Sequence, residues 1–233
     1  CSSDLGQPAK HEPFQPMPEG FVHVPFGDID ALSAAVDGSV AAVLVECVQG
    51  EGGVIPATDQ WLRDVRAMCT ERGALMMIDE VQTGFARTGD WFAFQHAGVQ
   101  PDVVMLAKAM GNGMPVGALW ARRDVASVFK PGDHGSTYSG TALATAAVIA
   151  VIELMQRIDA PRLAREKGEY LTTQLRTFGK VVDVRGRGLL LGVELGTNAD
   201  AKVVQAELLS KGLVTNAVTA TALRLAPPIT VTT

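Results

Sequence analysis

The chain has 233 residues, of which 47% are hydrophobic and 19% are charged, and its 20 basic and 25 acidic side chains give a formal net charge of −5. This apolar content excludes a disordered chain, because a chain of this length and composition can bury a sizeable core. The acidic balance argues against nucleic acid as the main partner, since that affinity relies on clustered Lys and Arg. The longest apolar run, residues 142–152, is too short to cross a bilayer, so we expect no membrane span.

The cysteines and the two ends of the sequence suggest its setting. Cys1, Cys47 and Cys69 form no CxxC pair, so we expect reduced thiols and a cytoplasmic location. The four histidines are too scattered for a metal-ligand set, and we expect no metal site. The chain starts without Met and stops soon after a predicted strand at 222–225, so we expect a piece of a longer enzyme.

Strand-length apolar runs alternate with helical patterns in the first part of the chain. Residues 1–20 contain four prolines and no periodicity, which predicts an extended lead-in. Four strands and one helix are then predicted: strands at 40–48, 74–78, 102–107 and 115–121, and a helix that Thr58 caps and that ends before Gly73. The strands show little polar alternation, which is typical of a parallel sheet buried between helices.

The second part of the chain has a different order of predicted helices and strands. Two long helices are predicted at 141–158 and 161–178, followed by strands at 181–184 and 189–195, a helix at 199–211, and strands at 213–218 and 222–225. The fold class is therefore α/β: a mostly parallel sheet sandwiched by helices, plus a smaller α+β C-terminal domain. We place the domains at 1–150 and 151–233.

Two charged side chains follow buried strands of the predicted sheet. Asp79 ends the run MMID at 76–79, and Lys108 comes directly after the strand at 103–107. Ligands bind at the carboxyl ends of strands in such sheets, so both residues can reach one cleft. Burial there would favour the neutral amine of Lys108, as in lysines that bind a carbonyl group covalently. Taken singly, Asp79 also fits a solvated strand end and Lys108 a lysine that extends to solvent.

The pair fits the chemistry of pyridoxal phosphate. A lysine holds the aldehyde of this cofactor, and an acid near the ring nitrogen keeps the pyridine protonated so that the ring accepts electrons. Five motifs extend the match: ECVQGEGG at 46–53, IDEVQTG at 78–84 with RTG at 87–89, LAKAMGNG at 106–113, HGSTY at 134–138 and LAPP at 225–228. In order and spacing they resemble the class III pyridoxal-phosphate aminotransferases, most of all the acetylornithine group, with ornithine and 4-aminobutyrate aminotransferases as near relatives.

This resemblance implies a fold-type I transferase whose active site is shared between the subunits of a homodimer. It makes Lys108 the lysine that holds the cofactor and moves a proton between the substrate α-position and the cofactor C4′ carbon. It pairs Asp79 with the pyridinium nitrogen, Val81 with a ring face and Gln82 with the phenolic oxygen. It implies that the Thr137 hydroxyl, together with Ser136, binds the phosphate of the cofactor in the neighbouring subunit.

The resemblance also implies a substrate site. Arg224 would receive the substrate α-carboxylate through two parallel hydrogen bonds. Glu51 would cover Arg224 when the substrate presents an amine there, and Glu46 would be a further polar contact near the reacting atoms. The implied reaction moves the δ-amino group of N-acetylornithine to 2-oxoglutarate and yields the semialdehyde and glutamate in arginine biosynthesis.

Two departures from the family pattern leave the catalytic groups in place. Cys47 stands where many relatives have Pro, and SGTA at 139–142 replaces the more usual GGNP. The family's N-terminal loop under the cofactor phosphate has no counterpart in this sequence. The alternatives are therefore an ornithine or 4-aminobutyrate aminotransferase, another class III enzyme, or an inactive binding scaffold.

Overall fold

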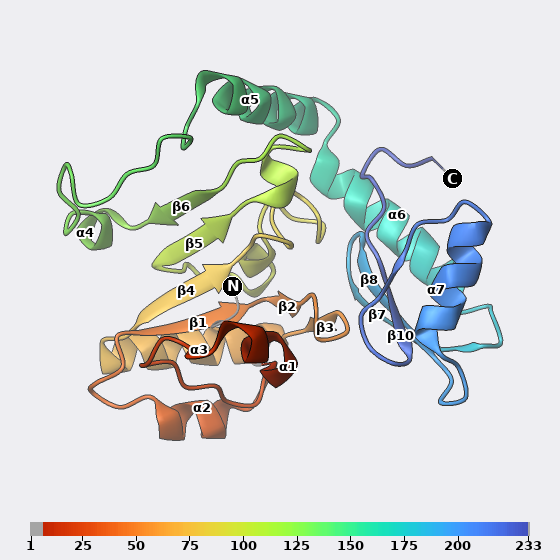
Figure 1. Cartoon of the computed structure of the whole chain (residues 1–233), viewed down its shortest axis with the longest axis horizontal. Coiled ribbons are helices and arrows are strands. Elements are labelled where there is room, and N and C mark those ends of the chain that lie inside the picture. Colours follow the sequence, from red (N-terminus) through yellow and green to blue (C-terminus); the bar gives the residue numbers. More distant parts are fainter. Residues whose placement is uncertain (1–6, 233) are drawn as a thin grey trace.

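The computed structural model describes residues 7–232, which form two four-stranded sheets and a short two-stranded ribbon (Figure 1). The large sheet has the order β1-β4-β5-β6 and the small sheet the order β7-β8-β10-β9. The strands of the large sheet are β1 (Ala42–Glu46), β4 (Leu75–Asp79), β5 (Val103–Leu106) and β6 (Ala118–Ala121). The others are β2 (Val48–Gln49) and β3 (Ile55–Pro56) in the ribbon, and β7 (Val181–Arg187), β8 (Leu190–Leu195), β9 (Asn216–Ala217) and β10 (Ala222–Leu225) in the small sheet.

The parallel core of the large sheet follows from its apolar runs. β1 pairs with β4 and β4 with β5, all parallel, with Val43 opposite Met76 and Ile78 opposite Val104. Val43, Met76 and Ile78 share a buried cluster with side chains of α2 (Ile29–Ala35) and α3 (Asp59–Arg72), and Val104 is buried as well. As predicted, Thr58 caps α3: its hydroxyl accepts a hydrogen bond from the Trp61 N–H at 3.1 Å.

The last strand of this sheet differs from the prediction. The sequence predicts a buried strand of a parallel sheet at 115–121, but β6 runs antiparallel to β5 and lies at the edge. Leu119 is 59% exposed and Trp120 43% exposed. The connection between β5 and β6 contains only the 3-10 turn η3 (Lys108–Met110), and a parallel return requires a longer crossover. The short connection therefore sets the direction of β6.

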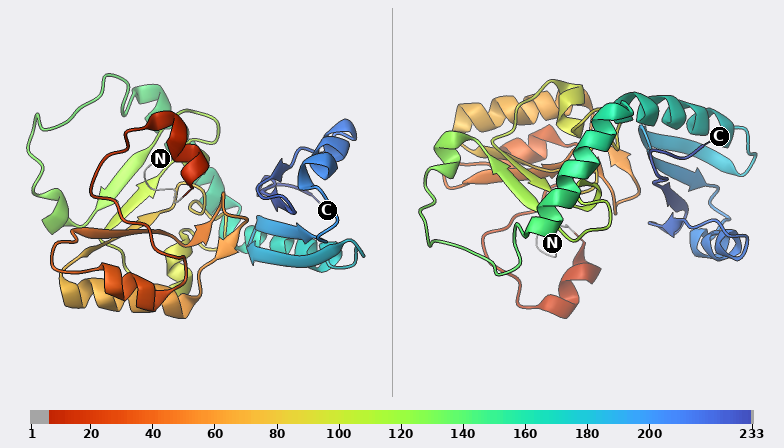
Figure 2. Two further views of the ribbon diagram at one scale, coloured as in Figure 1. Left: turned by 60° about the horizontal axis from the view of Figure 1, so that its bottom comes forward. Right: turned by 90° about the horizontal axis from the view of Figure 1, so that it is seen from above.

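Helices also pack on the other face of the large sheet and lead to the small one. α5 (Ala142–Arg157) crosses this face, and α6 (Ala160–Leu175) continues beside the small sheet (Figure 2). Val148 and Ile152 of α5 and Leu106 of β5 pack against one apolar cluster that contains Met110. Three shorter helical segments are η2 (Ala93–Ala97), α4 (Arg123–Ala126) and α7 (Ala201–Ser210). Both long helices confirm the prediction, and the division at 1–150 and 151–233 stays a prediction.

The lead-in is not fully extended. Residues 8–14 form α1 (Pro8–His11) and the 3-10 turn η1 (Glu12–Phe14), so the prediction of an extended segment is wrong there. Pro8 stands in the first turn of α1, where a missing N–H costs nothing. Among residues 7–232, no helix combines the length and the apolar character needed to cross a membrane.

A tight junction fixes the small sheet against the large one. Gly188, at φ +53°, lies so close to the loop at 86–89 that a Cβ would stand 2.6 Å from the Thr88 carbonyl carbon. A Cβ on Gly168 of α6 would stand 2.1 Å from the Gly188 carbonyl oxygen. The Arg87 guanidinium donates to the carbonyl oxygens of Leu189 and Pro227. Backbone contact of this kind leaves no room for side chains, so glycine is required at both positions.

A buried carboxylate ties three elements together at the opposite end of the large sheet. Asp102 is 2% exposed, and its Oδ2 accepts hydrogen bonds from Arg66 of α3 and from the Met76 N–H of β4, both at 2.7 Å. Its Oδ1 lies 2.7 Å from Arg122 Nη1 as an ion pair without hydrogen-bond geometry. Arg122 also pairs with Asp124, which is 69% exposed.

We predict that Asp102→Ala lowers the free energy of unfolding by about 3 kcal/mol, because it leaves the Met76 N–H and a half-buried guanidinium without their partner. Asp124→Ala is the matched control, since it removes an exposed partner of the same Arg122 and should change stability little. Urea unfolding of both variants checks this. Equal losses in the two variants would show that burial of Asp102 contributes nothing.

Candidate active site

The two residues singled out by the sequence lie at one edge of the large sheet. Asp79 is the last residue of β4 and stands opposite Met105 of β5. Lys108 opens η3, two residues beyond the end of β5. Because β4 and β5 are parallel, both residues lie at the carboxyl edge, where open α/β sheets bind ligands.

Asp79 offers a free carboxylate oxygen at this edge. The side chain is half-buried, and its Oδ1 accepts a hydrogen bond from the Val81 N–H at 2.8 Å. Within residues 7–232, no hydrogen bond or ion pair reaches Oδ2. The carboxylate is therefore positioned by its own turn and keeps one oxygen for a ligand.

Lys108 is exposed, so the prediction of a desolvated lysine is wrong for this chain. The backbone turns outward after β5, and burial resumes only at Met110. Lys108 has φ +46°, a left-handed conformation that costs energy for a residue with a side chain. No described residue makes an ion pair with its ammonium group. The amine is thus held by a strained turn and faces outward.

Glu80 anchors the turn after Asp79, a role that the sequence analysis missed. It is fully buried, its Oε1 accepts from the Phe94 N–H at 3.0 Å, and its Oε2 accepts from the Thr83 hydroxyl. Burial raises the pKa of Glu80. Strand alternation could have indicated this, because Ile78 and Glu80 share the buried side while Asp79 points to the other.

Gln82 links this turn to the small sheet. Its Oε1 accepts a hydrogen bond from Arg224 Nη1 at 3.3 Å. A Cβ on Gly50 would lie 1.8 Å from the same oxygen, so the amide occupies the space that glycine leaves. Val81 beside it is half-buried. Glycine at position 50 therefore allows one side chain to link the two sheets.

Arg224 and Glu51, which the family resemblance places in contact, form an ion pair in the structure. Arg224 lies in β10, 15% of its side chain is exposed, and its Nη1 lies 2.8 Å from Glu51 Oε1. Its Nη2 donates to Asn216 Oδ1 at 3.0 Å, a partner that the sequence analysis did not identify. Glu46 closes the loop before Glu51 by accepting from the Gly50 N–H at 3.0 Å. The structure brings Glu46, Glu51, Gln82 and Arg224 together.

Ser136 and Thr137 lie apart from these residues. Both are exposed, on the long loop between α4 and α5. This loop extends along the side of the large sheet away from η3 (Figure 1). Within this chain the two hydroxyls therefore do not join Asp79 and Lys108.

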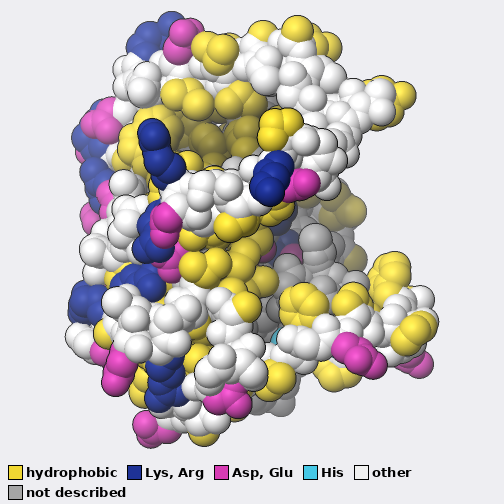
Figure 3. Space-filling model, turned by 90° about the vertical axis from the view of Figure 1, so that its left-hand side faces the viewer, with side chains coloured by type: hydrophobic (Ala, Val, Ile, Leu, Met, Phe, Trp, Pro, Cys, Tyr) yellow, Lys and Arg dark blue, Asp and Glu magenta, His cyan; other side chains and the backbone are white. Residues whose placement is uncertain are grey.

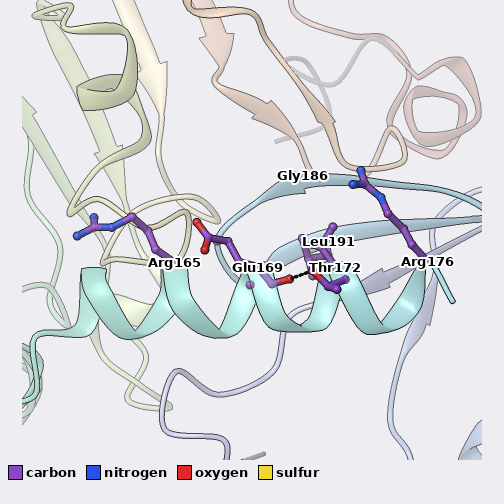
Figure 4. Close-up of a pocket in the computed structure, with 9 residues that line it drawn as sticks. Arg165, Glu169, Thr172, Arg176, Gly186 and Leu191 are labelled. Carbon is purple, nitrogen blue, oxygen red and sulfur yellow. Dashed lines mark hydrogen bonds between the residues drawn. The ribbon is translucent and has the colours of Figure 1, made fainter.

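A cavity of about 320 Å³ lies elsewhere, between α6 and the strands β7 and β8. Arg165 and Arg176 stand at its two ends, with Glu169 between them (Figure 4). Arg165 donates to the Gly89 carbonyl oxygen and Arg176 to that of Val184, so both guanidinium groups bind backbone at the ends of the cavity. This cavity contains none of the predicted site residues.

The thiols and acids show no other reactive cluster in the described part of the chain. Cys47 and Cys69 are buried free cysteines, and burial raises the pKa of Cys47 well above its ordinary value. In residues 7–232, His, Cys, Asp and Glu side chains form no group of three that could hold a metal ion. The two buried thiols fit the reduced cysteines that the sequence predicts, and Cys1 lies outside the described residues.

The hydrogen bond from Arg224, followed by the weaker one from Lys10, lowers the pKa of Glu51. We predict that Arg224→Met raises the titration midpoint of the Glu51 carboxyl more than Lys10→Met does. Because the pKa of Glu51 is lower in the folded protein than in the unfolded chain, the contact stabilises the fold at pH values above the unfolded-state pKa. This stabilisation is lost as the pH falls through the folded-state pKa. Carboxyl NMR of both variants measures the midpoints; no change in Arg224→Met would contradict the assignment.

Comparison with known proteins assigns the family. The family profile described as "Aminotransferase class-III" matches residues 3–233. Acetylornithine aminotransferase of Methanopyrus kandleri is 48% identical over 197 residues, covering 84% of this chain and 51% of that protein. The enzyme of the same name from Corynebacterium efficiens is 45% identical over 230 residues, covering 97% of this chain and 57% of that protein.

Solved structures agree with this match. An ornithine aminotransferase from Toxoplasma gondii superposes with a TM-score of 0.93 at 32% identity, covering 99% of this chain and 57% of that one. Acetylornithine aminotransferase from Elizabethkingia anophelis gives 0.86 at 34% identity, covering 92% and 59%. The chain thus has the α/β fold of these aminotransferases and spans little more than half the length of these relatives. The chain belongs to the class III aminotransferase family.

Proposed function

We propose that the protein is a pyridoxal-phosphate-dependent aminotransferase that moves the δ-amino group of N-acetylornithine to 2-oxoglutarate. The products are N-acetylglutamate semialdehyde and glutamate, a step of arginine biosynthesis. One observation carries the proposal: Asp79 and Lys108 share the carboxyl edge of the large sheet, and Gln82 connects that edge to Arg224. The curated relatives named acetylornithine aminotransferase, at 41–48% identity, support the choice of donor.

The donor set at this edge fits the cofactor. Pyridoxal phosphate, when bound, supplies an aldehyde and an electron-accepting pyridine ring. The amine of Lys108 has no competing ion pair among the described residues and would hold the aldehyde carbon. The free oxygen of Asp79 would keep the proton on the ring nitrogen. Val81 would pack on the ring, and the Gln82 amide would bind the phenolic oxygen.

Lys108 would also act as the base. Its Nζ would take the proton from the substrate carbon and return it on the cofactor side. The left-handed backbone at Lys108 fixes the base of a long side chain at the end of the strand. This arrangement suits an amine that would both hold the cofactor and transfer a proton.

Arg224 and Glu51 would distinguish the two substrates. With Glu51 on Arg224, the charge of the guanidinium is compensated, which favours a donor that presents an amine. With Glu51 displaced, the guanidinium can bind a carboxylate of 2-oxoglutarate through two parallel hydrogen bonds. Asn216 and Gln82 hold the guanidinium in either case.

A homodimer with a shared site is part of the proposal. Ser136 and Thr137 lie on an exposed loop, and in the partner arrangement they would bind the phosphate of the other subunit's cofactor. Hydrophobic side chains gather around a hollow on the side of the molecule shown in Figure 3. Exposed apolar residues of β6, this loop and α5 include Leu119, Phe129, Tyr138 and Leu143. Exposure of this extent favours a protein interface.

We propose a cytoplasmic location.

We predict that Lys108 is the point of cofactor attachment. The full-length protein is incubated with pyridoxal phosphate, reduced with borohydride and digested, and the label is located by mass spectrometry. Label on Lys108, and its loss in Lys108→Ala but not in Lys211→Ala, is expected, because Lys108 alone follows β5 at the carboxyl edge. Labelling at another lysine in the wild-type protein would refute the mechanism.

We predict that N-acetylornithine exceeds ornithine and 4-aminobutyrate as donor by about tenfold or more in kcat/KM. N-acetylation leaves one amine where ornithine has two, so N-acetylornithine brings a single cation to the edge that carries Asp79 and Lys108. 4-Aminobutyrate also has one amine but lacks the acetamido group that the site would bind. Steady-state rates with 2-oxoglutarate as acceptor measure the three values. A higher value for ornithine would assign the enzyme to the ornithine group, whose solved structures it also resembles.

A further inference from the structure

Glu51 is bound by two cations rather than one. Lys10 of α1 places its Nζ 3.1 Å from Glu51 Oε2, while Arg224 Nη1 lies 2.8 Å from Oε1. Each carboxylate oxygen therefore has its own partner. These partners come from opposite ends of the described chain, and neither contact blocks the other.

The two cations are held differently. Arg224 is 15% exposed and also donates to Gln82 and Asn216, so its guanidinium stays fixed without Glu51. Lys10 is 41% exposed, and within residues 7–232 its ammonium group contacts Glu51 alone. Glu51, at 42% exposed, has room to move with Lys10.

This asymmetry matters when Glu51 leaves Arg224. An isolated carboxylate that gives up an arginine loses a strong, charge-assisted hydrogen bond. In the observed state two like charges, those of Lys10 and Arg224, share one carboxylate and repel each other. Once Glu51 leaves Arg224 and takes the mobile Lys10 with it, this repulsion is relieved while the Lys10 ion pair remains. Lys10 therefore favours the displaced state over the observed one.

We propose that Lys10 is a positioning residue that holds Glu51 in the displaced state and thereby favours carboxylate binding by Arg224. This inference rests on the proposed function, since it concerns the exchange between an amine donor and a dicarboxylate acceptor at that site. Lys10 acts through Glu51 and does not touch the substrate.

The test uses the full-length holoenzyme and glutarate, a dicarboxylate that lacks the reactive oxo group. Lys10→Met keeps the length of the side chain and removes its charge. We expect glutarate binding, measured by calorimetry, to weaken about two- to fivefold, the range of a partly exposed ion pair. The KM for 2-oxoglutarate should rise by the same factor, with kcat and the donor KM unchanged. Lys211→Met, at an exposed lysine after α7, is the matched control.

The Glu51→Gln background shows whether Lys10 affects glutarate binding through Glu51 or by contacting the dicarboxylate itself. With a neutral amide at position 51, Lys10→Met should leave glutarate binding unchanged, and Lys10→Arg in the wild-type background should retain it. A loss that persists in the Glu51→Gln background would mean that Lys10 binds the dicarboxylate itself, and unchanged binding in Lys10→Met alone would mean that it has no role. Either result overturns the inference. Absence of transamination in the wild-type enzyme would instead refute the proposed function.

Discussion

The contact between Glu51 and Arg224 is the interaction on which the candidate site depends. It joins the loop after β2 to β10, across 173 residues of sequence. Arg224 belongs to the small sheet, whereas Asp79 and Lys108 belong to the large one. A site that uses all three therefore exists only when the sheets hold one relative position. The glycine contacts at positions 168 and 188, with the Arg87 hydrogen bonds, provide that constraint.

Charge organises the same region. Glu46 fixes the loop at Gly50, Gly50 leaves space for the Gln82 amide, and Gln82 contacts Arg224. Each of these three contacts requires a small or polar residue at one position. On the strand side, buried Glu80 holds the turn that presents Asp79. The site is thus a chain of short polar contacts supported by two apolar cores.

Most elements could be predicted from local patterns because their causes are local. Thr58 and Gly73 mark the ends of α3 by capping, and the apolar run before Asp79 forms β4. The direction of β6 could not be predicted from its composition, because it is set by the length of the connection from β5. The placement of Asp79 and Lys108 at one edge of the large sheet was predictable because each follows a buried strand. The contact of Lys10 with Glu51 spans 41 residues and leaves no periodic signal, so only the folded structure reveals it.

The proposed function depends on the exchange of Glu51 and a substrate carboxylate on Arg224. A crystal structure of the full-length protein with bound pyridoxal phosphate and glutarate tests it most directly. We expect a glutarate carboxylate on the Arg224 guanidinium, with Glu51 displaced and still within reach of Lys10. Glu51 remaining on Arg224, with glutarate bound elsewhere at the carboxyl edge, would contradict it.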